Sequence, residues 1–312
     1  MNKSNLSVWI HTVPIRPLQG AIFFLLLIIS PFPSSMIYAQ ETASRVEYKM
    51  FRSEALDQDK RCAVYLPEGY DASDKSYPVI YFLHGLFGSE DRWEERGAKP
   101  IVDQLMADST VVSAIIAIAD GDNSFYVNAI NGKAQYEDYI IEDFISFIES
   151  AYRVDSRRSH RAMSGISMGG FGSLMLGMKH PDLFSSISAH SAVLIPVPLD
   201  QLPPRLRESY QSQFFEAVFG NPVDEAHWEK HHPIDLVHTA TDLKTVAWYF
   251  DCGTEDRYGF HRGAAKLHMD MEASGIPHEY NLLPGGHGWE YVRTTLHRSL
   301  TFHSKHFQMA EE

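Results

Sequence analysis

The chain has few cysteines, no cationic excess and no long apolar run. Only two of its 312 residues are cysteine, too few for the disulfide framework that stabilises small secreted domains. Its 27 basic and 40 acidic side chains give a formal charge of −13, which argues against the cationic face that nucleic-acid binding needs. Low-complexity tracts are also absent, which excludes collagenous, coiled-coil and disordered classes. With 44% hydrophobic residues, the chain is long enough for one large globular domain or two small ones.

The apolar run near the N-terminus predicts an export signal. The run AIFFLLLII at 21–29 is well short of the ~20 residues that a membrane-spanning helix needs. It follows a stretch with Lys3 and Arg16 and no acidic residue, and a small residue, Ala39, lies beyond it. We therefore predict a cleaved signal peptide at 1–39 and a secreted or periplasmic protein with no membrane partner after cleavage. The alternative is an uncleaved anchor.

From Arg45 onward, apolar runs of strand length alternate with helix-periodic stretches. Several runs are nearly continuous in Val, Ile, Ala and Phe, which is typical of parallel strands buried on both faces. This pattern predicts an α/β fold, a mostly parallel sheet with helices on both faces, in a single domain over 40–312. Strands are expected at 61–67, 77–85, 111–121, 160–165, 184–191 and 244–253, and helices at 139–152, after Gly169 and from Trp289.

Residues 195–243 depart from this alternation. They contain six prolines and only two short helical pieces, at 208–220 and 224–232. We interpret this segment as a cap-like insertion over one edge of the sheet, beside the functional site. Export would permit a disulfide between Cys62 and Cys252, but the two cysteines fall on separate predicted strands, and the sequence leaves their pairing open.

The segment Gly165-Ile166-Ser167-Met168-Gly169 carries a candidate nucleophile. A G-x-S-x-G match is weak by itself, but this one lies between a predicted strand and an apolar helix. A serine at such a tight turn adopts strained backbone angles, and small residues two positions before and after it avoid a clash. The turn leaves the Ser167 hydroxyl exposed near the positive end of the next helix.

A serine hydroxyl needs a base to take its proton and an acid to orient that base. In this architecture the chain order is serine, acid, histidine. His287 lies in the glycine-rich stretch PGGHGWEY, just before the last predicted helix. Asp251 and Asp256, both in DCGTED, are candidate acids. We favour Asp256, because it lies in the loop and is free to turn toward His287, whereas Asp251 ends the strand.

The oxyanion that forms during acyl transfer needs two backbone N–H donors fixed in place beforehand. Met168 directly follows the nucleophile and supplies one donor. Leu86, in YFLHGLFGSEDRW, supplies the other, because Gly85 allows the chain to approach closely. His84 in the same turn either fixes the loop geometry or acts as the base, and we favour the first role.

Three further residues are candidates for substrate binding. Tyr126 and Asn128 follow a predicted strand, at the sheet edge where ligands bind in open α/β sheets. These two side chains either line the pocket or hold their loop by turn hydrogen bonds. Trp93 is either a substrate platform or a packing anchor, and we favour packing.

A histidine-rich segment raises the question of a metal ion. His227 and His231 are four residues apart in a helical piece, and His232 and His238 lie nearby. No H-E-x-x-H motif or cysteine-rich set accompanies them. We therefore expect a solvated histidine-rich face and no metal site.

Taken together, the motifs HGLFG, ADGDNSFYVN, SGISMGGFGSLMLGMKHPDLF, DCGTED and GGHGWEY resemble those of one esterase family, over about residues 45–305. That family takes in esterase D (S-formylglutathione hydrolase), tributyrin-type acetyl esterases, feruloyl esterase domains and the antigen 85 mycolyltransferases. The resemblance implies an α/β-hydrolase fold that works without a cofactor. It also implies that Ser167 is the nucleophile, Asp256 the acid and His287 the base, with Leu86 and Met168 as oxyanion donors.

These observations lead us to expect a secreted serine carboxylesterase whose partner is a small-molecule or carbohydrate ester. One alternative is acyl transfer to a sugar alcohol, as in the antigen 85 relatives. Another is thioester hydrolysis like that of S-formylglutathione hydrolase. The predicted export signal argues against it, because glutathione-thioester hydrolysis is a cytosolic task in this family. A third is a catalytically silent binding domain, against which the intact serine, aspartate and histidine set argues.

Overall fold

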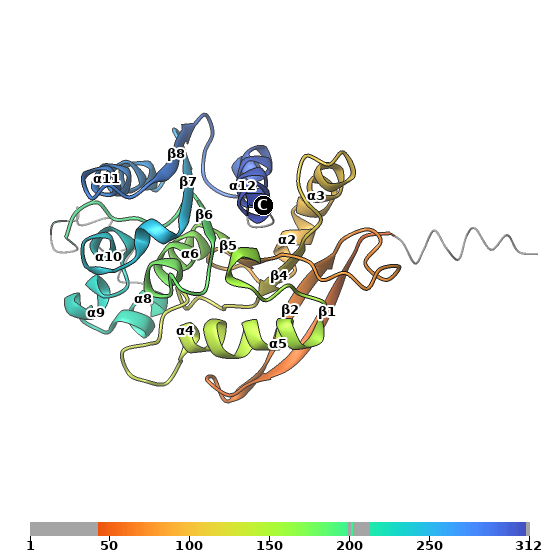
Figure 1. The fold of residues 1–312 in the computed structure, drawn as a ribbon. Helices are drawn as coiled ribbons and strands as arrows, with labels where there is room; N and C mark the ends of the chain where they lie inside the picture. Colours follow the sequence, from red (N-terminus) through yellow and green to blue (C-terminus); the bar gives the residue numbers. More distant parts are fainter. Residues whose placement is uncertain (1–42, 199–200, 202–212, 310–312) are drawn as a thin grey trace, which may run out of the picture.

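The computed structural model describes residues 43–198, 201 and 213–309 (Figure 1). The predicted signal peptide at 1–39 and part of the predicted insertion at 195–243 therefore lie outside the described residues. Within the described part of the chain, no helix combines the length and apolar character needed to cross a bilayer.

An eight-stranded sheet forms the centre of the molecule. Its strands are β1 (Arg45–Ser53), β2 (Gln58–Leu66), β3 (Val79–Leu83), β4 (Ile115–Ala119), β5 (Arg161–Ile166), β6 (Ser186–His190), β7 (Ala247–Gly253) and β8 (His278–Leu283). Their order in space is β1-β2-β4-β3-β5-β6-β7-β8. Strand β2 is antiparallel to both of its neighbours, β1 and β4, and all other pairs are parallel. This arrangement confirms the mostly parallel sheet that the sequence predicts.

The two strands that the sequence analysis did not predict, β1 and β8, lie at the two edges of the sheet. Edge strands have a neighbour on one side only, and these two are largely half-buried or exposed. Met50 on β1 is 65% exposed and Leu282 on β8 is 46% exposed. Neither strand therefore has the continuous apolar run that identified the six inner strands.

Helices cover both faces of the sheet (Figure 1). On one face, α3 (Ala98–Ala107) and α12 (Trp289–Met309) pack in a core with Phe82 and Ile118 of the sheet. A larger core on the other face contains apolar residues of α5 (Ile145–Ala151), α6 (Met168–Lys179), α10 (Pro233–Thr239) and α11 (Phe260–Ala273). The other helical elements of the described residues are α2 (Arg92–Glu95), α4 (Tyr136–Asp138), η1 (Tyr139–Phe144), η2 (Arg158–His160), α8 (Gln213–Phe219), α9 (Glu225–Glu229) and η4 (Leu243–Thr245).

The described part of the predicted insertion joins the helical layer over the sheet. Helix α10 contacts both α6 and α11, and its residues Ile234 and Val237 are buried in the larger core. Helices α8 and α9 pack against each other through Phe215, Phe219 and Trp228, whose rings lie 4.6–5.2 Å apart. The segment from α8 to α10 is thus part of the main body rather than a detached cap.

The two cysteines are far apart. Cys62 lies on β2 and Cys252 on β7, and both are buried and free. Four strands separate β2 from β7, which at about 4.8 Å per strand spacing places them more than 20 Å apart. A disulfide needs Cα atoms within roughly 7 Å, so the structure excludes a bridge between them.

A buried polar seam joins β6 to α12, and it consists of Ser186, Ser188, His190, Ser299 and His303. The Nδ1 and Nε2 atoms of His303 each lie 2.8 Å from a serine hydroxyl, of Ser186 and Ser188 respectively. The Nε2 atom of His190 lies 2.9 Å from the Ser299 hydroxyl. Burial lowers the pKa of His303 to about 3, so this ring is neutral in the folded protein near pH 7.

We expect His303 to make the fold sensitive to acid. Its pKa of about 3 in the fold lies below the 6.5 of an exposed histidine, so the unfolded chain takes up the proton first as the pH falls. The stabilising contribution is therefore lost from about pH 6.5 downward, by about 2 kcal/mol between pH 7 and pH 5. His303→Gln does not titrate there, so the free energy of urea unfolding should fall less between these pH values than in the parent protein. Equal losses in the two proteins would contradict this expectation.

Candidate active site

Ser167 lies in the turn between β5 and α6, where its backbone has φ 56° and ψ −113°. This region is strained for a residue with a side chain. A Cβ atom on Gly165 would lie 2.1 Å from the carbonyl oxygen of Gly169, and one on Gly169 would lie 2.0 Å from that of Leu83. Only glycine therefore fits at both positions, and the turn has the form that the G-x-S-x-G motif predicts.

The structure brings the three predicted side chains together. His287 Nε2 lies 3.0 Å from Ser167 Oγ, and His287 Nδ1 lies 2.7 Å from Asp256 Oδ2. Because a carboxylate only accepts, Nδ1–H is the donor to Asp256, and Nε2 is left to accept the hydroxyl proton of Ser167. This is the geometry of a serine activated by an oriented histidine.

The other candidate acid, Asp251, lies elsewhere. Its Oδ2 accepts hydrogen bonds from Nδ1 of His190 at 2.9 Å and from the hydroxyl of Tyr249 at 2.8 Å. Its side chain is fully buried beside the polar seam. Asp251 lies near the strand end, so its carboxylate is held in the protein interior. This position was the reason for preferring Asp256 as the acid.

Asp256 is held on both of its oxygens. Its Oδ2 faces His287, and its Oδ1 accepts the backbone N–H of Tyr258 at 2.9 Å. Burial raises the pKa of Asp256, but the hydrogen bond and charge of His287 outweigh burial, so the pKa lies below its ordinary value. The carboxylate therefore stays ionised. The rings of Tyr258 and Phe260 pack edge-on against His287, with centroids 4.8 and 5.5 Å away, and fix its orientation.

The loops that carry Asp256 and His287 are hydrogen-bonded to each other. They follow the adjacent parallel strands β7 and β8. The N–H of Thr254 donates to the carbonyl of Leu283 at 2.8 Å, and the N–H of Glu255 donates to that of Gly285 at 2.9 Å. Since Ser167 also follows a parallel strand, all three side chains come from the carboxyl ends of strands, where open α/β sheets bind ligands.

The residues proposed as oxyanion donors lie beside the nucleophile. Met168 is the first residue of α6. Leu86 lines the same cavity as Ser167. The preceding residue, Gly85, comes so near that a Cβ on it would lie 3.3 Å from Cβ of Ser167. We call residues 84–88 the oxyanion loop.

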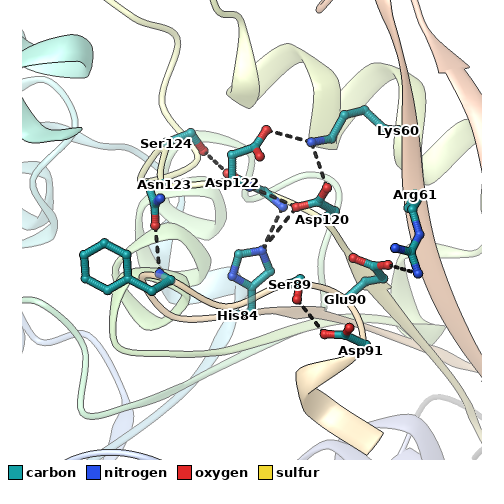
Figure 2. A network of polar contacts seen from close by, with 12 residues as sticks. Lys60, Arg61, His84, Ser89, Glu90, Asp91, Asp120, Asp122, Asn123 and Ser124 are labelled. Carbon is teal, nitrogen blue, oxygen red and sulfur yellow. Dashed lines mark hydrogen bonds and ion pairs between the residues drawn. The ribbon is translucent and has the colours of Figure 1, made fainter. Parts of the chain in front are cut away.

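His84 fixes the base of the oxyanion loop (Figure 2). Its Nε2 accepts the backbone N–H of Gly121 at 2.9 Å, and its Nδ1 lies 2.8 Å from the carbonyl oxygen of Gly85. Nδ1 therefore carries the proton and Nε2 does not. Both nitrogens are used by the backbone and the ring is buried, so His84 has the loop-fixing role that we favoured.

Two more residues of the 120–128 loop hold the oxyanion loop, and the sequence analysis did not assign them this role. Asn123 Oδ1 accepts the N–H of Phe87 at 2.8 Å (Figure 2). The hydroxyl of Tyr126 donates to the carbonyl of His84 at 3.0 Å. The Asp and Asn residues of this loop predict turns. The partners of Asn123 and Tyr126 lie 36 and 42 residues away along the chain, and sequence spacing does not indicate them.

Lys60 of β2 fastens the 120–128 loop (Figure 2). Its Nζ lies 3.1 Å from Asp120 Oδ2 and 2.7 Å from Asp122 Oδ2, and the lysine is almost fully buried. A buried ammonium between two carboxylates is strongly oriented by them. The loop that holds the oxyanion loop is thus itself anchored on β2.

None of the three predicted substrate-binding residues lines the cavity at Ser167, and this corrects the prediction. Tyr126 is fully buried, and its hydroxyl donates to the backbone carbonyl of His84 instead of facing the cavity. The amide of Asn128 donates to Asp138 at 2.7 Å and accepts backbone N–H groups at the start of α4. Trp93 is 1% exposed within the core under α12. Tyr126 and Asn128 therefore hold the chain by hydrogen bonds, and Trp93 has the packing role that we favoured.

A cavity of about 570 Å³ opens at Ser167 and His287. Seven of its lining residues are aromatic, and sequence reasoning did not predict this lining because the seven come from five separate segments of the chain. Phe87 of the oxyanion loop and Phe214 of α8 meet edge-to-face at 5.3 Å, so the predicted insertion reaches the site through α8. The aromatic lining residues are Phe87, Phe125, Phe214, Phe215, Tyr258, Phe260 and Trp289.

The histidine-rich segment is not the solvated face that we expected. His231 and His232 are buried, with exposed fractions of 6% and 2%. Burial lowers the pKa of His231 to about 4, and the Nδ1 atom of His232 bonds to Asp235 at 2.7 Å. No cluster of three or more His, Cys, Asp or Glu side chains suited to a metal ion occurs among the described residues.

Comparison with known proteins places this arrangement in a family. A family model described as "Putative esterase" matches residues 53–303. The sequence is 26% identical over 283 residues to an esterase of Mycobacterium tuberculosis, covering 82% of this chain and 58% of that protein. It is also 26% identical over 241 residues to an acetyl esterase of Caldicellulosiruptor saccharolyticus, covering 75% of this chain and 86% of that one. The chain thus spans little more than half of the mycobacterial relative.

Solved structures agree with this result. A ferulic acid esterase superimposes with a TM-score of 0.72 at 29% identity, covering 85% of this chain and 99% of the other. A fluorophosphonate-binding serine hydrolase of Staphylococcus aureus gives 0.70 at 20% identity, covering 84% and 99%, and supports the fold alone. The eight-stranded sheet is therefore that of the α/β-hydrolase fold, as the resemblance implied. With most of its length matched by the family model, the chain belongs to this esterase family.

Proposed function

We propose that the protein is a secreted serine carboxylesterase that hydrolyses small or carbohydrate-linked acyl esters. The observation that carries this proposal is the position of His287, within 3.0 Å of Ser167 Oγ and 2.7 Å of Asp256 at the mouth of an aromatic cavity. Family membership supports ester chemistry. The basic and apolar N-terminal residues support export.

In the first half of the reaction, Ser167 Oγ attacks the ester carbonyl while His287 Nε2 takes the hydroxyl proton. The tetrahedral intermediate carries a negative charge on the former carbonyl oxygen. His287 then gives its proton to the leaving alcohol as the ester C–O bond breaks, which leaves an acyl group on Ser167. In the second half, water attacks this acyl-enzyme, and His287 again takes and returns the proton.

Asp256 and the two amides supply the electrostatic part of catalysis. Asp256 is ionised and orients His287, and it stabilises the imidazolium that forms in each half-reaction. The N–H groups of Leu86 and Met168 stabilise the oxyanion, and losing one such donor costs about 3–4 kcal/mol of transition-state stabilisation. Their value depends on being fixed before the reaction begins.

The contacts of the oxyanion loop support this preorganisation. His84 and Tyr126 hold the start of the loop, and Asn123 engages the N–H of Phe87. The amide of Leu86 lies between these two fixed points, so its direction is set by the loop rather than by the substrate. An aromatic cavity suits an apolar or aromatic acyl group, which agrees with ferulic acid esterase as a structural neighbour.

A fluorophosphonate probe should label Ser167, because the probe reacts with serines that an adjacent histidine activates. Ser167→Ala should lose both the labelling and the hydrolysis of p-nitrophenyl acetate. Ser159→Ala is the matched control, because Ser159 Oγ also lies 3.0 Å from a histidine ring nitrogen, Nδ1 of His160, but does not line the cavity at Ser167. It should retain labelling and hydrolysis. Labelling that persists in Ser167→Ala would refute the assignment.

Asn123 tests the preorganised oxyanion loop. Asn123→Ala removes the acceptor for Phe87 N–H and should lower kcat for p-nitrophenyl acetate about tenfold with little change in KM, because the loop acts on the transition state. Asn123→Asp keeps an acceptor oxygen and should retain most of the activity. The urea midpoint should be similar in the two variants, and an unaltered kcat in Asn123→Ala would show that the contact does not position the loop.

A further inference from the structure

Three arginines, Arg92, Arg96 and Arg257, line the cavity at Ser167. The first two lie in and just after α2, which follows the oxyanion loop, and the third directly follows Asp256. No acidic side chain lines the cavity among the described residues. A local formal charge of +3 thus stands at the mouth of the site in a chain whose formal charge is −13.

These guanidinium groups have few internal counter-charges. Arg96 is exposed, and within the described chain no acidic side chain pairs with it. Arg257 donates to the Tyr258 hydroxyl at 3.0 Å and lies over its ring at 4.9 Å, contacts that leave its charge uncompensated. Arg92 pairs with Glu95 at 3.1 Å, but the two side chains are 40% and 53% exposed, and a pair so open to solvent contributes little.

Arg96 and Arg257 thus place two positive charges at one cavity with no carboxylate paired to them among the described residues, and an anion bound there relieves their mutual repulsion. Guanidinium also presents a planar set of donors that matches a carboxylate in two parallel hydrogen bonds. The aromatic walls provide the complementary apolar surface. The cavity therefore has the chemistry to hold an apolar group and a carboxylate at the same time.

From this lining we infer that the site selects esters that carry a carboxylate, which the arginine rim of Arg92, Arg96 and Arg257 binds. This inference rests on the proposed esterase function and narrows its substrate class. The charge belongs to the acyl part or to the alcohol part, since the arginines approach from both the oxyanion loop and the Asp256 loop. The experiment below distinguishes the two placements.

Two matched pairs of esters test the inference. The first pair, mono-p-nitrophenyl glutarate and p-nitrophenyl valerate, differs by a carboxylate on the acyl part. The second, 4-acetoxybenzoate and 4-acetoxybenzamide, differs by a carboxylate on the alcohol part. For at least one pair, kcat/KM of the native protein should be about tenfold higher for the charged member at low salt. This ratio should fall as the salt concentration rises.

The double variant Arg96→Gln/Arg257→Gln should bring the ratio of charged to neutral ester to about 1. The control Arg52→Gln makes the same kind of charge change on β1, at the far edge of the sheet. It should keep the native ratio. Whichever pair shows the effect identifies the part of the substrate that carries the charge.

A native preference for the neutral ester in both pairs would overturn the inference. So would a preference for the charged ester that survives the double substitution. Failure of the esterase proposal gives a different result, since then neither member of either pair would be hydrolysed in a way that Ser167→Ala abolishes.

Discussion

The positive-φ backbone of Ser167 is the constraint on which the rest of the site depends. Such a conformation costs about 1–3 kcal/mol and persists only where the surroundings enforce it. Here the N–H of Ser167 donates to the carbonyl of His190 at 2.9 Å, and its carbonyl accepts the N–H of Val193 at 3.2 Å. The glycines make room for this turn, and the end of β6 and the loop after it hold the nucleophile in place by hydrogen bonds.

The polar seam links this support to the base. His190, whose carbonyl holds Ser167, is bound through its ring to Asp251 on β7 and to Ser299 on α12. Helix α12 begins two residues after His287. The same buried network thus fixes the strand behind the nucleophile and the helix that ends the histidine loop. Both ring nitrogens of His190 and of His303 have partners in this network, and such paired buried groups rigidify a core, which a site needing sub-ångström placement requires.

Sequence reasoning succeeded where local chemistry decides the structure. The turn at Ser167 and the six inner strands follow from short patterns, and loop position was enough to separate Asp256 from Asp251. It failed where burial depends on distant partners. Tyr126 looks like a ligand-facing residue until the carbonyl of His84, 42 positions away, is seen to take its hydroxyl. The cavity walls were missed for the same reason, since separate segments of the chain form them. The edge strands β1 and β8 were missed for another reason, because half-exposed strands lack a continuous apolar run.

The contrast between the net charge and the cavity charge limits what the arginine rim can do. At physiological ionic strength, charges are screened beyond about 8 Å. The three arginines therefore act on a ligand only when it is close to the cavity, and the net negative charge of the chain acts on it earlier in its approach. A chain of charge −13 does not attract an anion from a distance. The three arginines act only once the ester has reached the cavity, within the screening distance of their charges. Their effect therefore belongs to discrimination between bound substrates rather than to the rate of encounter.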